Sequence, residues 1–210
     1  MEITIAIFFV IILLFSAVIH EFAHGWMANY YGDPTAKFMG RLTLNPIPHI
    51  DLVGSILVPL FLVLSNFGFI FAWAKPVPYN PHNLRDKKNG EMFVALAGPL
   101  SNLIIAFIFG TIIRMMMMQN IDSSMISFFS FIVYLNIILA LFNLVPIPPL
   151  DGSKILFHFL PYSMQGTKDF LEKNGMILLL VFILFGGFEW ILWPILEFLF
   201  VFFTGSAGLL

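Results

Sequence analysis

The chain has 210 residues, of which 60% are hydrophobic and only 10% are charged, with a formal net charge of -2. An ordinary soluble domain is about 25% charged, so this composition and a mean hydropathy of +0.94 predict a polytopic protein in a lipid bilayer. No basic stripe indicates a nucleic-acid partner, and the absence of cysteine excludes disulfides and thiolate metal sites. We expect one integral-membrane domain, 1–210.

The first predicted element is one long helix over residues 3–30, which Gly32-Asp33-Pro34 ends. We expect no removable signal peptide here, because the segment lacks a basic n-region. Residues 3–19 are apolar except for Thr4 and Ser16, which predicts a membrane-spanning first part.

The last turns of this helix carry His20-Glu21-Phe22-Ala23-His24. His20 and His24 lie about 40° apart on one helix face, so they can share a metal ion, and Glu21 projects from nearly the same side. The pattern also occurs by chance in soluble helices, and histidines at the end of a membrane helix are a further alternative. Ionisable residues directly after an apolar run are costly without partners, which favours a functional site.

Residues 36–48 alternate weakly between apolar and polar, which predicts a short strand or hairpin near the membrane surface. We expect an extended substrate to pair with its edge near residues 38–44. Residues 52–74 are long enough to span the membrane, but Pro59 and a Ser65–Gly68 break interrupt them. A basic loop, 75–90, follows.

Four full crossings are predicted, at residues 3–28, 91–118, 125–144 and 176–203. Basic residues favour the cytoplasmic side, and they lie both before and after residues 52–74. We therefore predict that this segment is re-entrant, which places the His-Glu-x-x-His and Asp151 near the same cytoplasmic face. If residues 52–74 were a fifth crossing, the His-Glu-x-x-His and Asp151 would lie on opposite faces of the membrane. The fold class expected is an all-α polytopic membrane protein with about four full transmembrane helices, one re-entrant segment and a short β-hairpin near the zinc site.

A third metal ligand is needed, because a catalytic zinc ion usually has three protein ligands. Asp151 is the best candidate, because it follows three prolines in four positions, a broken backbone of the kind that lines cavities. It could also be the N-cap of a short helix, and both roles can hold at once. With His20, His24 and Asp151 as ligands of one Zn²⁺ per chain, Glu21 would act as general base.

The sequence resembles the site-2 protease family of zinc intramembrane metalloproteases, in the compact bacterial and archaeal form without PDZ or CBS domains. The resemblance rests on HEFAH at 20–24, AGPLSN at 97–102 and NLVPIPPLDG at 143–152, with RLTLNPIPHID at 41–51 and AKPVPYN at 74–80. It covers a core of about 15–156 and implies zinc ligands at His20, His24 and Asp151 and the base at Glu21.

The resemblance also implies an endopeptidase that cleaves membrane-spanning protein or peptide substrates, in regulated intramembrane proteolysis or signal-peptide clearance. It places a multi-pass protein in a prokaryotic cell membrane, with the zinc site toward the cytoplasm. The rivals are a small ion- or proton-translocating protein and a non-catalytic metal-binding scaffold. Oligomeric state is not predicted.

Four further residues are weaker site candidates. Asn102 and Asn143 are expected near the substrate or oxyanion, although Asn102 also fits helix packing and Asn143 could hydrogen-bond the broken backbone. His49 and Asp51 could orient a zinc ligand, although an interaction within their loop is the alternative.

Overall fold

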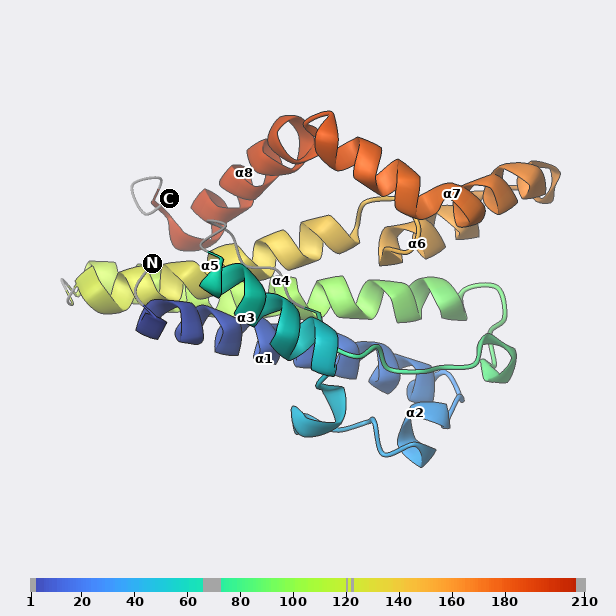
Figure 1. The fold of residues 1–210 in the computed structure, drawn as a ribbon, viewed down its shortest axis with the longest axis horizontal. Coiled ribbons are helices and arrows are strands. Elements are labelled where there is room, and N and C mark those ends of the chain that lie inside the picture. The colour runs from blue at the N-terminus through green and yellow to red at the C-terminus, as the bar shows by residue number, and fades with distance from the viewer. Residues whose placement is uncertain (1–2, 66–72, 120, 122, 207–210) are drawn as a thin grey trace. The chain divides into compact units, whose positions relative to one another are not determined.

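The computed structural model of the chain describes residues 3–65, 73–119, 121 and 123–206, and it divides into two compact units, Met1–Gly98 and Pro99–Leu210. Every regular element in this described part is helical (Figure 1). The first unit contains α1 (Ile3–Tyr30), α2 (Thr35–Phe38), η1 (Ile47–His49), η2 (Leu52–Leu57), α3 (Val58–Leu64) and η3 (Pro81–Asn83). Helix α4 (Gly90–Met118) begins there and continues into the second unit, which contains α5 (Ser123–Asn143), α6 (Asp151–Phe159), η4 (Tyr162–Met164), α7 (Gln165–Leu184), η5 (Phe188–Leu192) and α8 (Trp193–Thr204).

Three helical stretches in the described residues are long and apolar enough to cross a membrane: Ile7–Tyr30, Gly90–Met118 and Ser124–Asn143. A fourth is counted if Tyr162–Leu184 and Phe188–Thr204 form one span, but these two helices meet at an angle of 69°. The chain is therefore an integral membrane protein. Its last apolar segment, predicted as one crossing over 176–203, consists of two helices joined at this bend.

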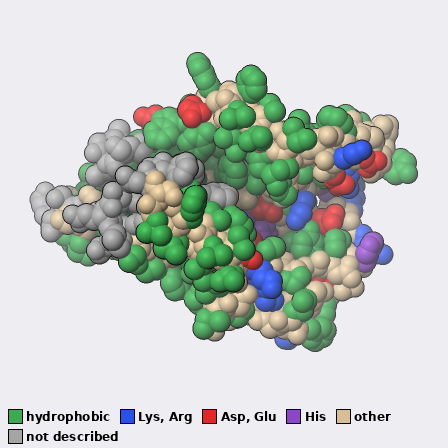
Figure 2. Space-filling model, viewed as in Figure 1, with side chains coloured by type: hydrophobic (Ala, Val, Ile, Leu, Met, Phe, Trp, Pro, Cys, Tyr) green, Lys and Arg blue, Asp and Glu red, His purple; other side chains and the backbone are tan. Residues whose placement is uncertain are grey.

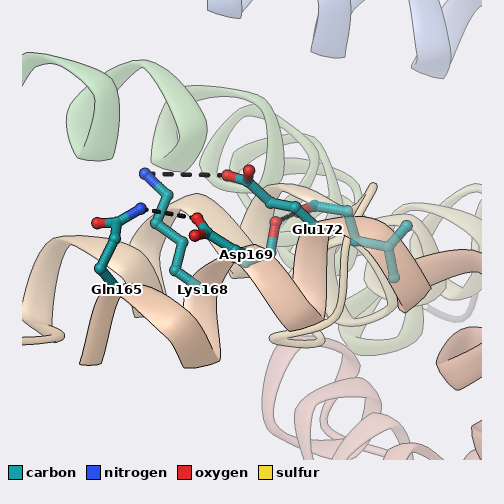
Figure 3. A network of polar contacts seen from close by, with 6 residues as sticks. Gln165, Lys168, Asp169 and Glu172 are labelled. Carbon is teal, nitrogen blue, oxygen red and sulfur yellow. Dashed lines mark hydrogen bonds and ion pairs between the residues drawn. The ribbon is translucent and has the colours of Figure 1, made fainter.

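The bend between α7 and η5 has a local cause at Gly186. This residue has a φ of +79°, in the left-handed region that favours glycine. The helix before it begins at Gln165, earlier than residue 176, where the last crossing was predicted to begin. Side-chain pairs one turn apart stabilise this polar start of α7: Gln165 donates to Asp169 at 2.8 Å, and Lys168 lies 3.8 Å from Glu172 (Figure 3).

The predicted β-hairpin at residues 36–48 is wrong, because the described residues contain no strand. The chain forms the short helix α2 instead, then turns at Gly40, whose φ is +66°. Local hydrogen bonds satisfy the backbone that a ladder would have paired. The Thr43 hydroxyl accepts from the Asn45 N–H at 3.1 Å, and the Asn45 side chain accepts from the Ile47 N–H at 3.1 Å. With no strand edge here, the expected pairing of substrate at 38–44 loses its basis.

The two ends of the 52–74 segment lie together. The Trp73 N–H donates to the Gly54 carbonyl at 3.1 Å, and the Ser55 hydroxyl donates to the Trp73 carbonyl at 2.7 Å. The Trp73 indole occupies the space that a Gly54 side chain would need. A straight crossing would place the ends of the segment about 30 Å apart, so these contacts are incompatible with one. Residues 66–72, which include part of the predicted Ser65–Gly68 break, lie outside the described residues.

The core of the second unit is formed by one face each of α4, α5 and α8. Its fully buried members include Ile113, Ile137 and Leu196. Arg114, near the C-terminal end of α4, donates from its Nε to the Phe203 carbonyl at 2.9 Å. Its charge therefore lies at the C-terminal end of α8, where a cation is favourable.

Hydrophobic side chains are spread over the described part of the face seen in Figure 2. Many large apolar side chains on the long helices are exposed, among them Ile104 and Phe107 on α4 and Leu180 on α7. In water such a surface would be an aggregation liability, whereas lipid tails cover it at no cost.

Candidate metal centre

The two histidines of α1 are brought together at metal-ligand spacing. His20 and His24 are buried, and their Nε2 atoms are 3.0 Å apart. Two nitrogen ligands on a tetrahedral zinc ion, each about 2.0–2.1 Å from it, are separated by roughly 3.3 Å. The i, i+4 spacing that the sequence predicts on one helix face therefore aims both rings at one point.

A second hydrogen bond determines the tautomer of His24. Its Nδ1 donates to the Val94 carbonyl, on α4, at 2.7 Å. With the proton on Nδ1, the lone pair of Nε2 is left to bind a metal, and the ring orientation is fixed. This is the second hydrogen bond that metal-binding histidines usually make.

Gly98 provides the space in front of the two rings. A Cβ atom at this position would lie 2.4 Å from His24 Nε2 and 2.6 Å from His20 Nε2. Any side chain would therefore occupy the point toward which both nitrogens are directed. Two buried imidazole nitrogens beside a glycine gap fit a zinc ion, which favours nitrogen ligands.

Glu21 is held beside this pair by the loop that follows residues 52–74. Its Oε2 accepts a hydrogen bond from the Val77 backbone N–H at 2.7 Å. The carboxylate is thus fixed by backbone, on the same turn of α1 as the two histidines. A nearby carboxylate that is not a ligand is the arrangement a general base needs.

Asp151 is the first residue of α6 in the second unit and is buried. The backbone before it is folded tightly, because a Cβ at Gly152 would lie 2.2 Å from the Leu144 carbonyl oxygen. The N-cap position belongs to Leu150, whose carbonyl accepts from the Ser153 hydroxyl at 2.6 Å. Asp151 is therefore not the N-cap that was its alternative role, and its place as third ligand stays a prediction.

The two asparagines predicted to lie near the substrate both hydrogen-bond to residues of the second unit. Asn102 is fully buried and donates from Nδ2 to Asn136 Oδ1 at 2.8 Å, which joins α4 to α5. Asn136 in turn donates to the Ile132 carbonyl at 2.9 Å. Asn143 donates to the Leu139 carbonyl one turn earlier, at 2.9 Å. Their contact with substrate or oxyanion stays a prediction.

His49 and Asp51 both make the loop contacts that were their alternative roles. The buried His49 contacts the Thr43 carbonyl through Nε2 at 2.9 Å. Asp51 caps η2, because its Oδ1 accepts from the N–H groups of Val53 and Gly54 at 3.1 and 2.7 Å. These contacts organise the start of the 52–74 segment.

Sequence reasoning missed the residues that support the centre from a distance. Val94 and Val77 act through backbone atoms, which leave no signal in the sequence. Gly98 lay within a motif quoted for its resemblance, but its steric role needs the positions of both histidines. Asp33 was considered only as part of a helix end and Arg41 only as the first residue of the motif at 41–51, yet both are buried and hydrogen-bonded.

A His-Glu-x-x-His helix whose histidines converge beside a fixed carboxylate is typical of metallopeptidases. The family model of Peptidase family M50 matches residues 109–186. Over 196 residues the chain is 38% identical to the Bacillus subtilis (strain 168) protein named "Putative zinc metalloprotease YwhC", which covers 90% of this chain and 86% of that protein. The chain therefore belongs to peptidase family M50, as the resemblance to site-2 proteases predicted.

More distant relatives carry similar names. "Putative zinc metalloprotease Rip2" of Mycolicibacterium smegmatis is 28% identical over 175 residues, which are 81% of this chain and 64% of that protein. "Zinc metalloprotease MJ0392" of Methanocaldococcus jannaschii is 28% identical over 195 residues, or 92% of this chain and 47% of that protein. No solved structure matches the chain.

Proposed function

We propose that the chain is a zinc-dependent endopeptidase of the site-2 protease type, which hydrolyses peptide bonds in or near transmembrane segments of other membrane proteins. The observation that carries this proposal is the pair of buried Nε2 atoms, 3.0 Å apart, on a helix that is apolar enough to span the membrane. Soluble peptidases have no need of such a helix. The names of the M50 relatives agree with this chemistry.

Three protein ligands hold the zinc ion in this proposal: His20, His24 and Asp151. Asp151 supplies the carboxylate that two histidines lack, and it is buried at the start of a helix that follows the proline-broken 144–150 stretch. Bound zinc would supply Lewis-acid chemistry, lowering the pKa of a water molecule and polarising the scissile carbonyl.

Glu21 has the role of general base. Its carboxylate takes a proton from the attacking water and then gives it to the leaving amine, so one group serves both halves of the reaction. The Val77 N–H holds Oε2 while this happens. Asn102 and Asn143 are proposed to lie near the substrate, and both carry side-chain amides that can donate to a developing oxyanion.

The substrate is proposed to be a membrane-spanning protein or peptide. A transmembrane helix hides its peptide bonds in internal hydrogen bonds, so the enzyme must act where the helix unwinds. Substrates with helix-weakening Gly, Asn or Pro near the cleaved bond are therefore expected to be preferred. The metal centre is proposed to face the cytoplasm, as the basic loops indicate.

Metal analysis tests the ligand assignment. Purified wild-type protein should contain about one zinc ion per chain, and His20→Ala, His24→Ala and Asp151→Ala should each lose most of it, because two ligands do not hold zinc tightly. His82→Ala is the matched control, since His82 is exposed in the 75–90 loop. Wild-type zinc content in His20→Ala and His24→Ala would show that the site is wrong.

A further inference from the structure

The Glu21 carboxylate is positioned by residues 75–80, whose sequence is Lys-Pro-Val-Pro-Tyr-Asn. The Lys75 N–H donates to the His49 carbonyl at 2.8 Å, and the Val77 N–H donates to Glu21 Oε2 at 2.7 Å. Pro76 lies between these two residues and Pro78 follows them, and proline has no backbone N–H. Lys75 and Val77 are therefore the two N–H donors on either side of Pro76, and each has an acceptor.

A buried arginine contacts this segment at the same peptide group. Arg41 is only 9% exposed, and its Nη2 donates to the Lys75 carbonyl at 2.7 Å and to the Pro76 carbonyl at 3.3 Å. The Pro76 carbonyl and the Val77 N–H are the two ends of one peptide unit. A guanidinium therefore contacts the oxygen of the peptide whose N–H binds Glu21.

This order of groups has a physical consequence. A positive charge at the carbonyl end of a peptide increases the polarisation of its N–H, which strengthens a hydrogen bond to a carboxylate. The peptide plane is rigid, so fixing its oxygen also fixes the direction in which its N–H points. Arg41 is thus coupled to Glu21 both electrostatically and geometrically, although the two side chains belong to different elements.

The far end of the segment is anchored to α1, the helix that carries Glu21. Asp33 lies just beyond the end of α1, is completely buried and accepts from the Asn80 N–H at 2.6 Å and from the Asn83 side chain at 2.9 Å. Arg41 and Asp33 therefore hold residues 75–80 on both sides of Val77.

We propose that Arg41 is a positioning residue for the general base and acts on Glu21 through the peptide group between Pro76 and Val77. The inference rests on the proposed function, in which Glu21 is the base. Glu21 is held by Oε2, and its other oxygen, Oε1, receives the proton of the attacking water. Loss of Arg41 leaves the base in place along the chain but lets its carboxylate rotate.

The kinetic test compares Arg41→Gln, which removes the charge, with Arg41→Lys, which keeps it. We expect kcat to fall about tenfold or more in Arg41→Gln with KM and zinc content unchanged, because misplacing a catalytic group affects the chemical step. Arg41→Lys should recover part of the loss. Lys37→Gln, which removes an exposed charge on α2, is the matched control and should retain the wild-type kcat.

A measurement without catalysis tests the same contact. Hydrogen exchange at the Val77 N–H can be followed in protein labelled with ¹⁵N-valine, where comparison with Val77→Ala identifies its signal among those of the eleven valines. Both Arg41→Gln and Glu21→Ala should speed exchange at Val77, whereas Lys37→Gln should not. Unchanged exchange at Val77 in Arg41→Gln would overturn the inference.

A second pair of variants covers the case in which Arg41→Gln does not fold. Val77→Pro removes the N–H, and Val77→Ala keeps it while also losing the valine side chain. We expect kcat to fall in Val77→Pro relative to Val77→Ala, and equal values would overturn the inference. If Glu21→Gln retains full proteolysis, the proposed function fails, while hydrogen exchange still shows whether Arg41 orders this peptide.

Discussion

The space beside the two histidines, more than side-chain polarity, determines which residue can stand there. Gly98 shows this best, because it sits inside a regular helix where alanine would ordinarily be preferred by about 1 kcal/mol. At this position the alanine methyl would meet His24 Nε2 at 2.4 Å. Glycine at this position lowers the stability of α4 but keeps the space between the imidazoles and the helix open.

Gly98→Ala should therefore weaken zinc binding, because the added methyl displaces the two imidazoles. We expect zinc affinity to fall about tenfold to a hundredfold, the range seen when groups supporting a metal site are changed. Competition with a chelator measures it. Gly166→Ala, on α7 where nothing lies within 4 Å of the added atom, should leave the affinity unchanged. Equal affinities in both variants would show that the space is not used by the metal.

Asp33 predicts a pH dependence of stability. Burial alone would raise the pKa of its carboxyl, but hydrogen bonds from Thr35, Asn80 and Asn83 outweigh burial and hold the pKa below the ordinary value of 3.8. The folded state therefore binds this proton less readily than the unfolded state does. The stabilisation is complete well above pH 3.8 and is lost as the pH falls through the lowered pKa.

Unfolding measured in detergent from about pH 6 to about pH 2.5 tests this dependence. At neutral pH, Asp33→Asn should be less stable than wild type by about 2 kcal/mol, the contribution of hydrogen bonds to a charged group. The difference should shrink as the solution is acidified, because wild type then loses its carboxylate as well. A difference that is constant with pH would contradict the assignment.

At the scale of elements, α4 and α5 are joined by a pair of buried amides. The hydrogen bond between Asn102 and Asn136 lies within helices that are otherwise apolar, where such contacts contribute about 0.6–2 kcal/mol. We expect a double-mutant cycle with Asn102→Ala and Asn136→Ala to give a coupling energy of about 1 kcal/mol in unfolding. Zero coupling would mean that the contact adds nothing to packing.

The same cycle separates the two roles given to Asn102. If it only packs α4 against α5, both single variants should lose activity only as far as they lose stability. If Asn102 also binds the oxyanion, Asn102→Ala should lower kcat by about a hundredfold more than Asn136→Ala does.

The long helices could be predicted from the sequence because each is a long apolar run, and α1 begins and ends within two residues of its prediction. Residues 36–48 could not, because weak alternation carries less information than the side-chain hydrogen bonds of Thr43 and Asn45. The i, i+4 histidines could be predicted from one helix. Arg41 and Asp33 could not, since their contacts lie 34 and 47 residues away in the chain.

At the scale of the whole molecule, the basic loops predict the orientation. The chain has no cysteine, so single-cysteine variants report accessibility without background. Cysteine in place of Lys37, Lys87 or Lys173 should react with an impermeant reagent from the cytoplasmic side, and cysteine in place of Gln119 from the opposite side. All four positions are exposed. Labelling of positions 37 and 87 from opposite sides would contradict the prediction that residues 52–74 enter the membrane and return to the same side.

The central claim is that Glu21 acts as the base in peptide-bond hydrolysis within the membrane. The most direct measurement compares the amounts of membrane-protein fragments in cells that carry only wild type or only Glu21→Gln. The Gln variant keeps the size of the side chain and removes the base. We expect uncleaved membrane-spanning fragments to accumulate in Glu21→Gln, with zinc content unchanged and with the same fragments accumulating in His24→Ala. Indistinguishable fragment profiles in wild type and Glu21→Gln, with both proteins folded and zinc-loaded, would contradict the claim.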